Sequence, residues 1–208
     1  MEDILAVYKR AYDPDFPLVC MDETTKQLTK ETRKPRMTDL GRAARYDYEY
    51  SRNGVSNVFM FFEPFKGKRH VKVTERRTKV DWAIQIKDLL DNHYPEAEKV
   101  VLVMDNLNTH KGASLYETFP PAEARRLFER LEIHYTPKHG SWLNIAEIEL
   151  RILSGQCLKR RIPDESTLKQ EIAEWQKKRN CLDAKVDWQF TNEDARIKLK
   201  RLYPTLLT

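Results

Sequence analysis

The sequence predicts an α/β fold in which a mixed sheet carries helices on both of its faces. Two apolar runs, at residues 17–22 and 99–105, have the composition of buried strands. A β-prone stretch lies between them at residues 48–74, and residues 79–93 repeat apolar side chains with the period of a helix. Strands and helices that alternate in this order pack as helical layers around one sheet.

Residues 1–55 are predicted to form a helix, a strand and a long loop. Residues 1–15 have the pattern of a short amphipathic helix, and residues 17–22 follow as the first buried strand. Residues 23–55 are polar and lack a regular apolar repeat, and lysines and arginines crowd residues 23–47. We therefore expect a basic loop there, and loops of this length in compact domains usually serve a function.

Further strands and helices are predicted along the rest of the chain. Asn53-Gly54 predicts a hairpin between residues 48–51 and 56–62, because both residues tolerate positive φ. Alternating valines predict a strand at residues 69–74. The remaining expected elements are helices at 79–93, 120–131 (with Pro121 in its first turn), 144–153 and 164–178, strands at 99–105 and 131–135, a short extended piece at 186–190, and a last helix that Thr191 caps and that ends near Tyr203.

Length and composition predict one domain, residues 1–208, with a core at 15–155 and a helical appendage at 156–208. With 33% charged residues and no long apolar run or secretory signal, we expect a soluble protein without a membrane partner. The three cysteines are widely spaced and show no zinc-type pairing, which indicates reduced thiols in the cytoplasm.

The net charge of +5 is unevenly distributed along the chain. Residues 1–22 carry a net −3 and residues 80–150 a net −5, whereas residues 23–79 carry +8 and residues 151–208 carry +5. Such segregation suits an acidic metal centre inside a phosphate-binding surface. An uneven solvated surface is the simpler alternative.

Three acids form the candidate centre. Asp22 and Asp105 each end a predicted buried strand, where open α/β sheets bind ligands, and Glu147 follows the turn at residues 136–144. Carboxylates are the ligands that Mg²⁺ prefers, and two such ions can clamp the attacking and leaving oxygens at phosphorus. The three acids therefore predict metal-dependent phosphoryl transfer.

Each acid also has a structural alternative. Asp22 and Asp105 could cap the turns that follow them. Glu147 lies three residues after Asn144, which is the spacing of a capping box. Glu149 is the alternative third ligand; it lies two positions on, about 200° around a helix, so only one of the two glutamates can face the ions. A surface position is the alternative for His110, which could otherwise position substrate or act as an acid or base.

The residues around these acids resemble the three acidic motifs of DDE transposases. The matching segments are VCMDE at 19–23, LVMDNLNTH at 102–110 and YTPKHGSWLNIAE at 135–147. Their order resembles in particular the bacterial insertion-sequence-six-thirty group of the Tc/mariner superfamily, and the resemblance covers the chain from about Asp15 to Tyr203.

The resemblance implies an RNase H-like fold and a centre for two Mg²⁺ or Mn²⁺ ions at Asp22, Asp105 and Glu147. Such a centre cuts double-stranded DNA at transposon ends and joins the freed 3′-hydroxyl to target DNA. A bacterial, nucleoid-associated protein in the cytoplasm is implied, and a homodimer is compatible with the family. The residues expected to contact DNA are Lys26, Arg33, Lys34, Arg36, Asn106, His110, Lys138, His139, Lys159, Arg160 and Arg161.

The sequence departs from the family pattern in three ways. Ile145-Ala146 replaces Pro-Ile, and 41 residues separate Asp105 from Glu147, more than in typical mariner relatives. We expect the extra length within residues 113–124. No helix-turn-helix region precedes Asp22, so we expect the catalytic portion alone. A structure-selective nuclease of the same fold and a non-catalytic DNA-binding remnant are the alternative functions.

Overall fold

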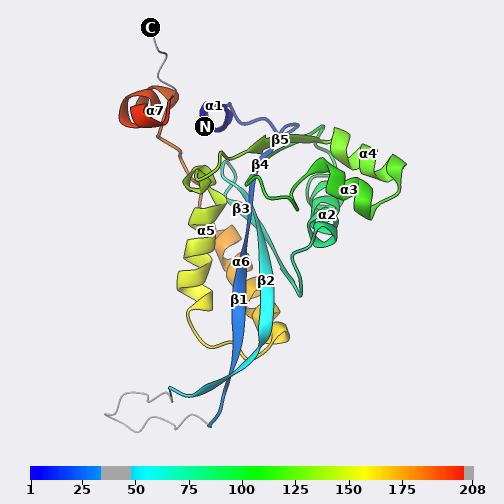
Figure 1. Ribbon diagram of the computed structural model, residues 1–208, viewed down its shortest axis with the longest axis vertical. Helices are drawn as coiled ribbons and strands as arrows, with labels where there is room; N and C mark the ends of the chain where they lie inside the picture. The colour runs from blue at the N-terminus through cyan, green and yellow to red at the C-terminus, as the bar shows by residue number, and fades with distance from the viewer. Residues whose placement is uncertain (34–47, 204–208) are drawn as a thin grey trace.

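The computed structural model describes residues 1–33 and 48–203, and its centre is one mixed five-stranded sheet (Figure 1). The strands are β1 (Leu18–Glu31), β2 (Tyr50–Glu63), β3 (Lys68–Thr74), β4 (Val100–Met104) and β5 (Leu131–Tyr135), in the order β3-β2-β1-β4-β5. β1 pairs antiparallel with β2 and parallel with β4. β2–β3 is antiparallel and β4–β5 is parallel, so the predicted mixed sheet is confirmed.

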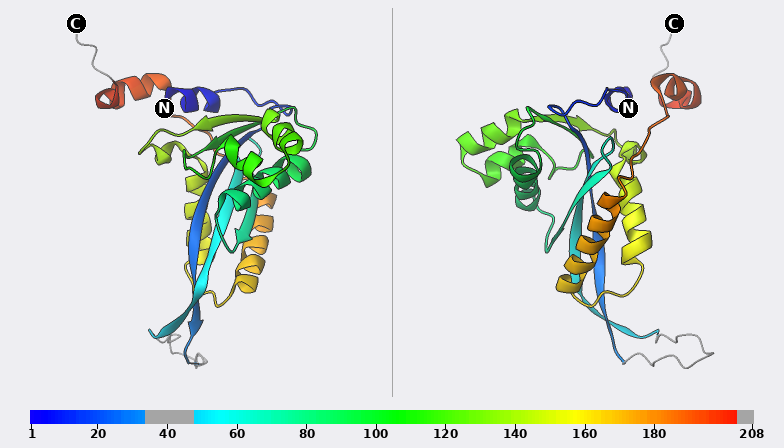
Figure 2. Two further views of the ribbon diagram at one scale, coloured as in Figure 1. Left: turned by 45° about the vertical axis from the view of Figure 1, so that its right-hand side comes forward. Right: turned by 180° about the vertical axis from the view of Figure 1, so that it is seen from behind.

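Helices cover both faces of the sheet, as predicted (Figure 2). The helices are α1 (Glu2–Tyr8), α2 (Lys79–Asp88), α3 (Gly112–Thr118), α4 (Pro121–Glu129), α5 (Ala146–Leu153), α6 (Glu165–Cys181) and α7 (Asn192–Lys198). Side chains alternate along β1, so Cys20 packs with α1, α5 and α6 on one face, whereas Val19 packs with α2, α3 and α4 on the other. The sheet therefore lies between two apolar clusters, one on each face, which hold the helices against it.

The expected loop at residues 23–55 and the hairpin at Asn53-Gly54 are wrong. β1 continues to Glu31 and pairs with β2, and the two strands form a long ribbon that projects from the body (Figure 1). Gly54 lies inside β2 with a φ of 89°, next to the register shift between Gln27 and Thr29 of β1. Asn-Gly therefore accommodates an irregularity in the ladder instead of a chain reversal. Residues 34–47 lie outside the described residues.

The helical predictions are mostly confirmed, with differences at the ends. α2 ends at Asp88 and continues as a π-helical turn, η1 (Leu89–His93). Most of α3 and the first turn of α4 occupy residues 113–124, the segment where extra length was expected. Thr191 caps α7 in a capping box with Asp194, whereas residues 186–190 form no strand. In the described ranges, no helix is long and apolar enough to cross a membrane.

Gly67 is required in the turn between β2 and β3. Its φ is 65°, and an added Cβ would come within 2.6 Å of the carbonyl carbon of Asp183. We expect Gly67→Ala to lower the free energy of unfolding by about 1–3 kcal/mol, because a side chain strains both the backbone and this contact. Gly155→Ala is the control, since Gly155 has nothing within 4 Å of the added Cβ. Urea titrations with equal midpoints for the two variants would contradict this role of Gly67.

Candidate active site

The sheet brings Asp22 and Asp105 to the same region. Cys20 of β1 is the partner of Val103 in the neighbouring parallel strand β4, and each aspartate lies two residues further along its chain. Adjacent strands are about 4.8 Å apart, so the register makes the two carboxylates neighbours at the carboxyl end of β4. β1 itself continues past this point, and Asp22 therefore lies within a strand and not at a strand end.

Negative charge accumulates around Asp22. Burial raises the pKa of this carboxyl group, and the charges of Asp105, Glu147 and Glu23 raise it further, to about 7. The backbone N–H of Glu23 donates to Oδ1 at 2.8 Å and opposes this shift. Within residues 1–33 and 48–203, no lysine, arginine or histidine forms an ion pair with Asp22 or Glu147. Asp22 and Glu147 therefore carry negative charge that no protein cation in these ranges balances and that a bound cation would stabilise.

Asn144 fixes the start of α5 against the strand that carries Asp22. This side chain is 1% exposed, its Nδ2 donates to the carbonyl of Met21 at 2.8 Å, and its Oδ1 accepts from the N–H of Ala146 at 3.1 Å. The N–H of Asn144 donates to the carbonyl of Ser141, so the capping-box interpretation of Glu147 is wrong. Asn144 thereby holds the first turn of α5, with Glu147, beside β1.

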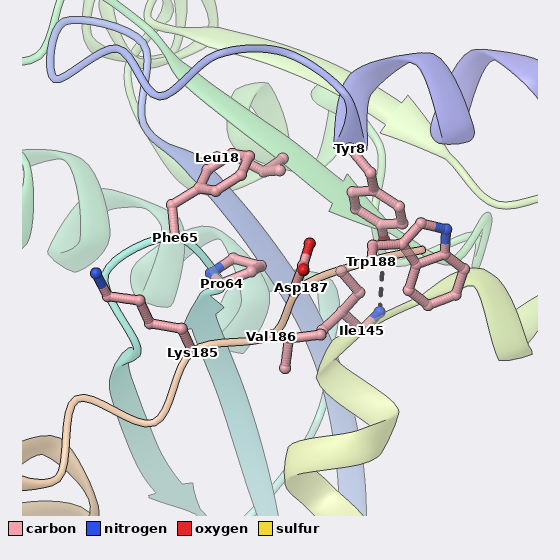
Figure 3. Close-up of a pocket in the computed structure, with 9 residues that line it drawn as sticks. All are labelled: Tyr8, Leu18, Pro64, Phe65, Ile145, Lys185, Val186, Asp187 and Trp188. Carbon is pink, nitrogen blue, oxygen red and sulfur yellow. Dashed lines mark hydrogen bonds between the residues drawn. The ribbon is translucent and has the colours of Figure 1, made fainter. Parts of the chain in front are cut away.

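Tyr8 supports the same turn from the other side (Figure 3). Its hydroxyl donates to the carbonyl of Leu143 at 2.6 Å and accepts from the N–H of Ile145 at 3.4 Å. The ring of Trp188 packs on Tyr8 with the centroids 5.1 Å apart. None of the three predicted acids lines the pocket between these residues. Its lining residues support the start of α5 and are not part of the acidic site.

Glu149 is buried in an ion-pair network on the far side of α5. Its side chain is 1% exposed and lies 2.6 Å from Nε of Arg69 in β3 and 3.0 Å from a guanidinium nitrogen of Arg179 in α6. Burial acts to raise the pKa of Glu149, but the two arginines lower it below its ordinary value. Glu149 is thus committed to these cations, whereas the charge of Glu147 acts on Asp22.

His110 is inside the protein, so its interpretation as a surface histidine is wrong. The ring is 0% exposed, with Nδ1 2.5 Å from Oδ1 of Asp105 and Nε2 3.4 Å from Oε2 of Glu23. Burial acts to lower the pKa of His110, but the carboxylates of Asp105 and Glu23 raise it to about 9. The ring is not accessible for the DNA contact expected from its position in the sequence.

Several predicted DNA contacts have partners within the protein. Nζ of Lys26 donates to the carbonyls of Leu158 and Arg160, at 2.5 Å and 3.1 Å. The guanidinium groups of Arg33, Arg160 and Arg161 are partly neutralised by ion pairs within the protein. The corresponding ion pairs are Arg33 with Glu49 at 3.8 Å, Arg160 with Glu171, and Arg161 with Glu31 at 2.5 Å.

Other predicted contacts are exposed. Asn106 follows β4, Lys138 and His139 lie in the turn after β5, and Lys159 follows the π-helical turn η3 (Ser154–Leu158). The turn after β5 bends sharply at His139, which has a φ of 64°. Lys34 and Arg36 lie outside the described residues.

The acids suit a hard cation by their chemistry. Mg²⁺ and Mn²⁺ bind oxygen ligands, and the unbalanced charge at Asp22 favours a divalent ion. In the described part of the chain, no three ligating side chains already surround one point.

The ion pairs of Glu149 with Arg69 and Arg179 are expected to stabilise the fold. Replacing one partner of a buried pair leaves the other charge uncompensated, so Glu149→Gln should lower the free energy of unfolding by about 3–5 kcal/mol. The control is Glu117→Gln, which breaks the exposed pair with Lys79 and should cost about 1 kcal/mol or less. Chemical denaturation measures both. A Glu149 variant as stable as the Glu117 variant would show that the arginines do not depend on this carboxylate.

Comparisons with known proteins agree with this geometry. A family model described as "DDE superfamily endonuclease" matches residues 17–169. Comparison with curated protein sequences gave no match. Solved structures that resemble the chain include a Mos1 transposase paired-end complex with left transposon end, at 17% identity and a TM-score of 0.57 over 84% of this chain and 51% of that chain.

Two further Mos1 structures are similar. The mariner Mos1 paired end complex with Mg has 18% identity and a TM-score of 0.59 over 88% of this chain and 53% of that chain. The Mos1 Strand Transfer Complex has 16% identity and a TM-score of 0.57 over 89% of this chain and 59% of that chain. The present chain thus spans somewhat more than half of their length, and the likeness confirms the RNase H-like fold.

The family model covers most of the chain and includes all three acids of the candidate centre. The chain belongs to the DDE superfamily endonuclease family.

Proposed function

We propose that this chain is the catalytic domain of a DDE transposase, which cuts double-stranded DNA at transposon ends and joins the 3′-hydroxyl to target DNA. The observation that carries the proposal is the β1–β4 register, which makes Asp22 and Asp105 neighbours, together with the charge of Glu147 acting on Asp22. The Mos1 structures named above include complexes with a transposon end and with Mg, and they support the same chemistry here. The proposal extends to a bacterial member of the insertion-sequence-six-thirty group.

Asp22, Asp105 and Glu147 are proposed to hold two Mg²⁺ or Mn²⁺ ions. Bound ions of this kind activate a water or hydroxyl nucleophile and stabilise the leaving 3′-oxygen. The protein contributes the orientation of the carboxylates: the β1–β4 register sets Asp22 beside Asp105, and Asn144 sets the first turn of α5. Glu149 has no place in this set because Arg69 and Arg179 occupy it.

Mg²⁺- or Mn²⁺-dependent nicking of supercoiled plasmid tests the proposal. Asp105→Asn should reduce nicking by about two orders of magnitude or more, because the lost ligand removes several kcal/mol of charge stabilisation. Asp88→Asn is the matched control: the side chain of Asp88 is 25% exposed, similar to Asp105 at 30%, and lies in α2 away from the cluster. We expect nicking by the Asp88 variant to stay within a few-fold of the parent, on the order of 1 kcal/mol.

Two outcomes would contradict the proposed function. Equal nicking by the parent and Asp105→Asn removes Asp105 from the mechanism. Cutting of branched DNA without any joining of a 3′-end to a second duplex identifies a structure-selective nuclease of the same fold.

DNA affinity should depend steeply on salt, and the basic residues should contribute unequally. Lys159 is exposed, whereas Nζ of Lys26 is held by two carbonyl groups. Lys159→Ala should reduce the slope of log K against log salt by about 1, whereas Lys26→Ala should leave it unchanged. Fluorescence anisotropy with a short duplex at several salt concentrations measures the slopes. Equal slopes for the parent and the Lys159 variant would exclude Lys159 from the DNA interface.

A further inference from the structure

We propose that Glu23 and His110 are positioning residues that hold Asp105 in the orientation in which it binds metal. The inference rests on the proposed function, because it assigns these residues to the metal centre described above. We refer to the chain of contacts Asp22–Glu23–His110–Asp105 as the carboxylate clamp.

Asp105 needs an external support. It follows the last residue of β4 and lies in an irregular segment, so no strand pairing fixes its side chain, which is 30% exposed. The contact with Nδ1 of His110, at 2.5 Å, holds Oδ1 and leaves Oδ2 for a cation. A carboxylate with one oxygen fixed loses less conformational freedom when it binds an ion.

His110 is itself held on several sides. Its N–H donates to the carbonyl of Leu107 at 3.1 Å, and its carbonyl accepts from the hydroxyl of Tyr135 at 2.8 Å. The ring lies 6.0 Å from the indole of Trp82 in α2, measured between centroids. Nε2 faces Glu23 at 3.4 Å. These contacts orient the ring, so its Nδ1 is directed at Asp105.

Glu23 connects the two aspartates. It follows Asp22 in β1, and because side chains alternate along a strand, Glu23 points to the opposite face, toward α2. Its N–H donates to Oδ1 of Asp22 at 2.8 Å, whereas its carboxylate faces His110 and lies 3.4 Å from a guanidinium nitrogen of Arg77. One residue thus contacts the first aspartate through its backbone and the second through His110.

His110 contacts the proposed metal ligand Asp105, and Glu23 contacts His110, but neither of the two is itself proposed to bind the metal. Groups that hydrogen-bond to ligating side chains orient them, and their loss typically weakens metal binding by about 10- to 100-fold. Glu23 and His110 are buried, with side chains 5% and 0% exposed, so they do not contact DNA directly. Their side chains instead connect β1, the segment after β4 and the start of α2.

Mn²⁺ titration of the full chain without DNA, followed by the electron paramagnetic resonance signal of free Mn²⁺, tests the clamp. His110→Asn and His110→Gln are the matched pair. The asparagine amide can replace Nδ1 and keep the bond to Asp105, whereas the longer glutamine amide extends toward Glu23. We expect His110→Gln to weaken Mn²⁺ binding by about 10- to 100-fold and His110→Asn to restore most of the affinity.

Thermal unfolding is measured alongside, because both variants lose the same packing against Trp82. A purely structural His110 would weaken Mn²⁺ binding equally in both variants, in parallel with their melting temperatures, and this result would overturn the clamp. Glu23→Gln should weaken Mn²⁺ binding as well, and wild-type affinity in this variant would remove Glu23 from the clamp.

Asp105→Asn separates this inference from the proposed function. If the parent protein binds no Mn²⁺, or if Asp105→Asn binds it as well as the parent, the proposed metal centre is wrong and the clamp with it. If the parent binds Mn²⁺ and Asp105→Asn does not, the metal centre stands, and the two His110 variants alone decide the clamp.

Discussion

The parallel pairing of β1 with β4 is the constraint on which the candidate site depends. It places Cys20 opposite Val103 and so brings two aspartates that are distant in the sequence to neighbouring positions. The apolar side chains of both strands are buried on both faces of the sheet, so this pairing lies between the two apolar clusters of the core. The packing of these strands in the core therefore places two negatively charged carboxylates next to each other.

The helix that carries the third acid is fixed by polar contacts of a different kind. Asn144 ties its first turn to β1, and Glu149 ties the opposite side of the helix to Arg69 and Arg179. With one glutamate held by two arginines, the other is left free of ion pairs in the described ranges. The two glutamates of α5 thus have separate roles, one in stability and one beside the aspartates.

Apolar runs and helical periodicity were sufficient to predict the strands around Val19 and Leu102 and the helices on both faces. The outer part of β1 was missed because its residues, such as Thr25 and Lys26, are polar, and because the partners that hold it, β2 and the segment at residues 158–162, are distant in sequence. Glu23 and His110 show a similar difficulty at the site. The position of His110 near Asp105 made it a candidate, whereas Glu23 was missed, because their burial and mutual contact depend on tertiary packing that local sequence does not contain.

The central position of β1 has a consequence for synthesis on the ribosome. β1, β2 and β3 leave the ribosome first and can pair as an antiparallel meander, whereas the other edge of β1 stays open until β4 arrives. That edge contains apolar residues such as Val19, and exposed apolar edges favour intermolecular association. Pairing with β4 therefore both covers this apolar edge and brings Asp105 beside Asp22, so one step completes the sheet and the acidic cluster.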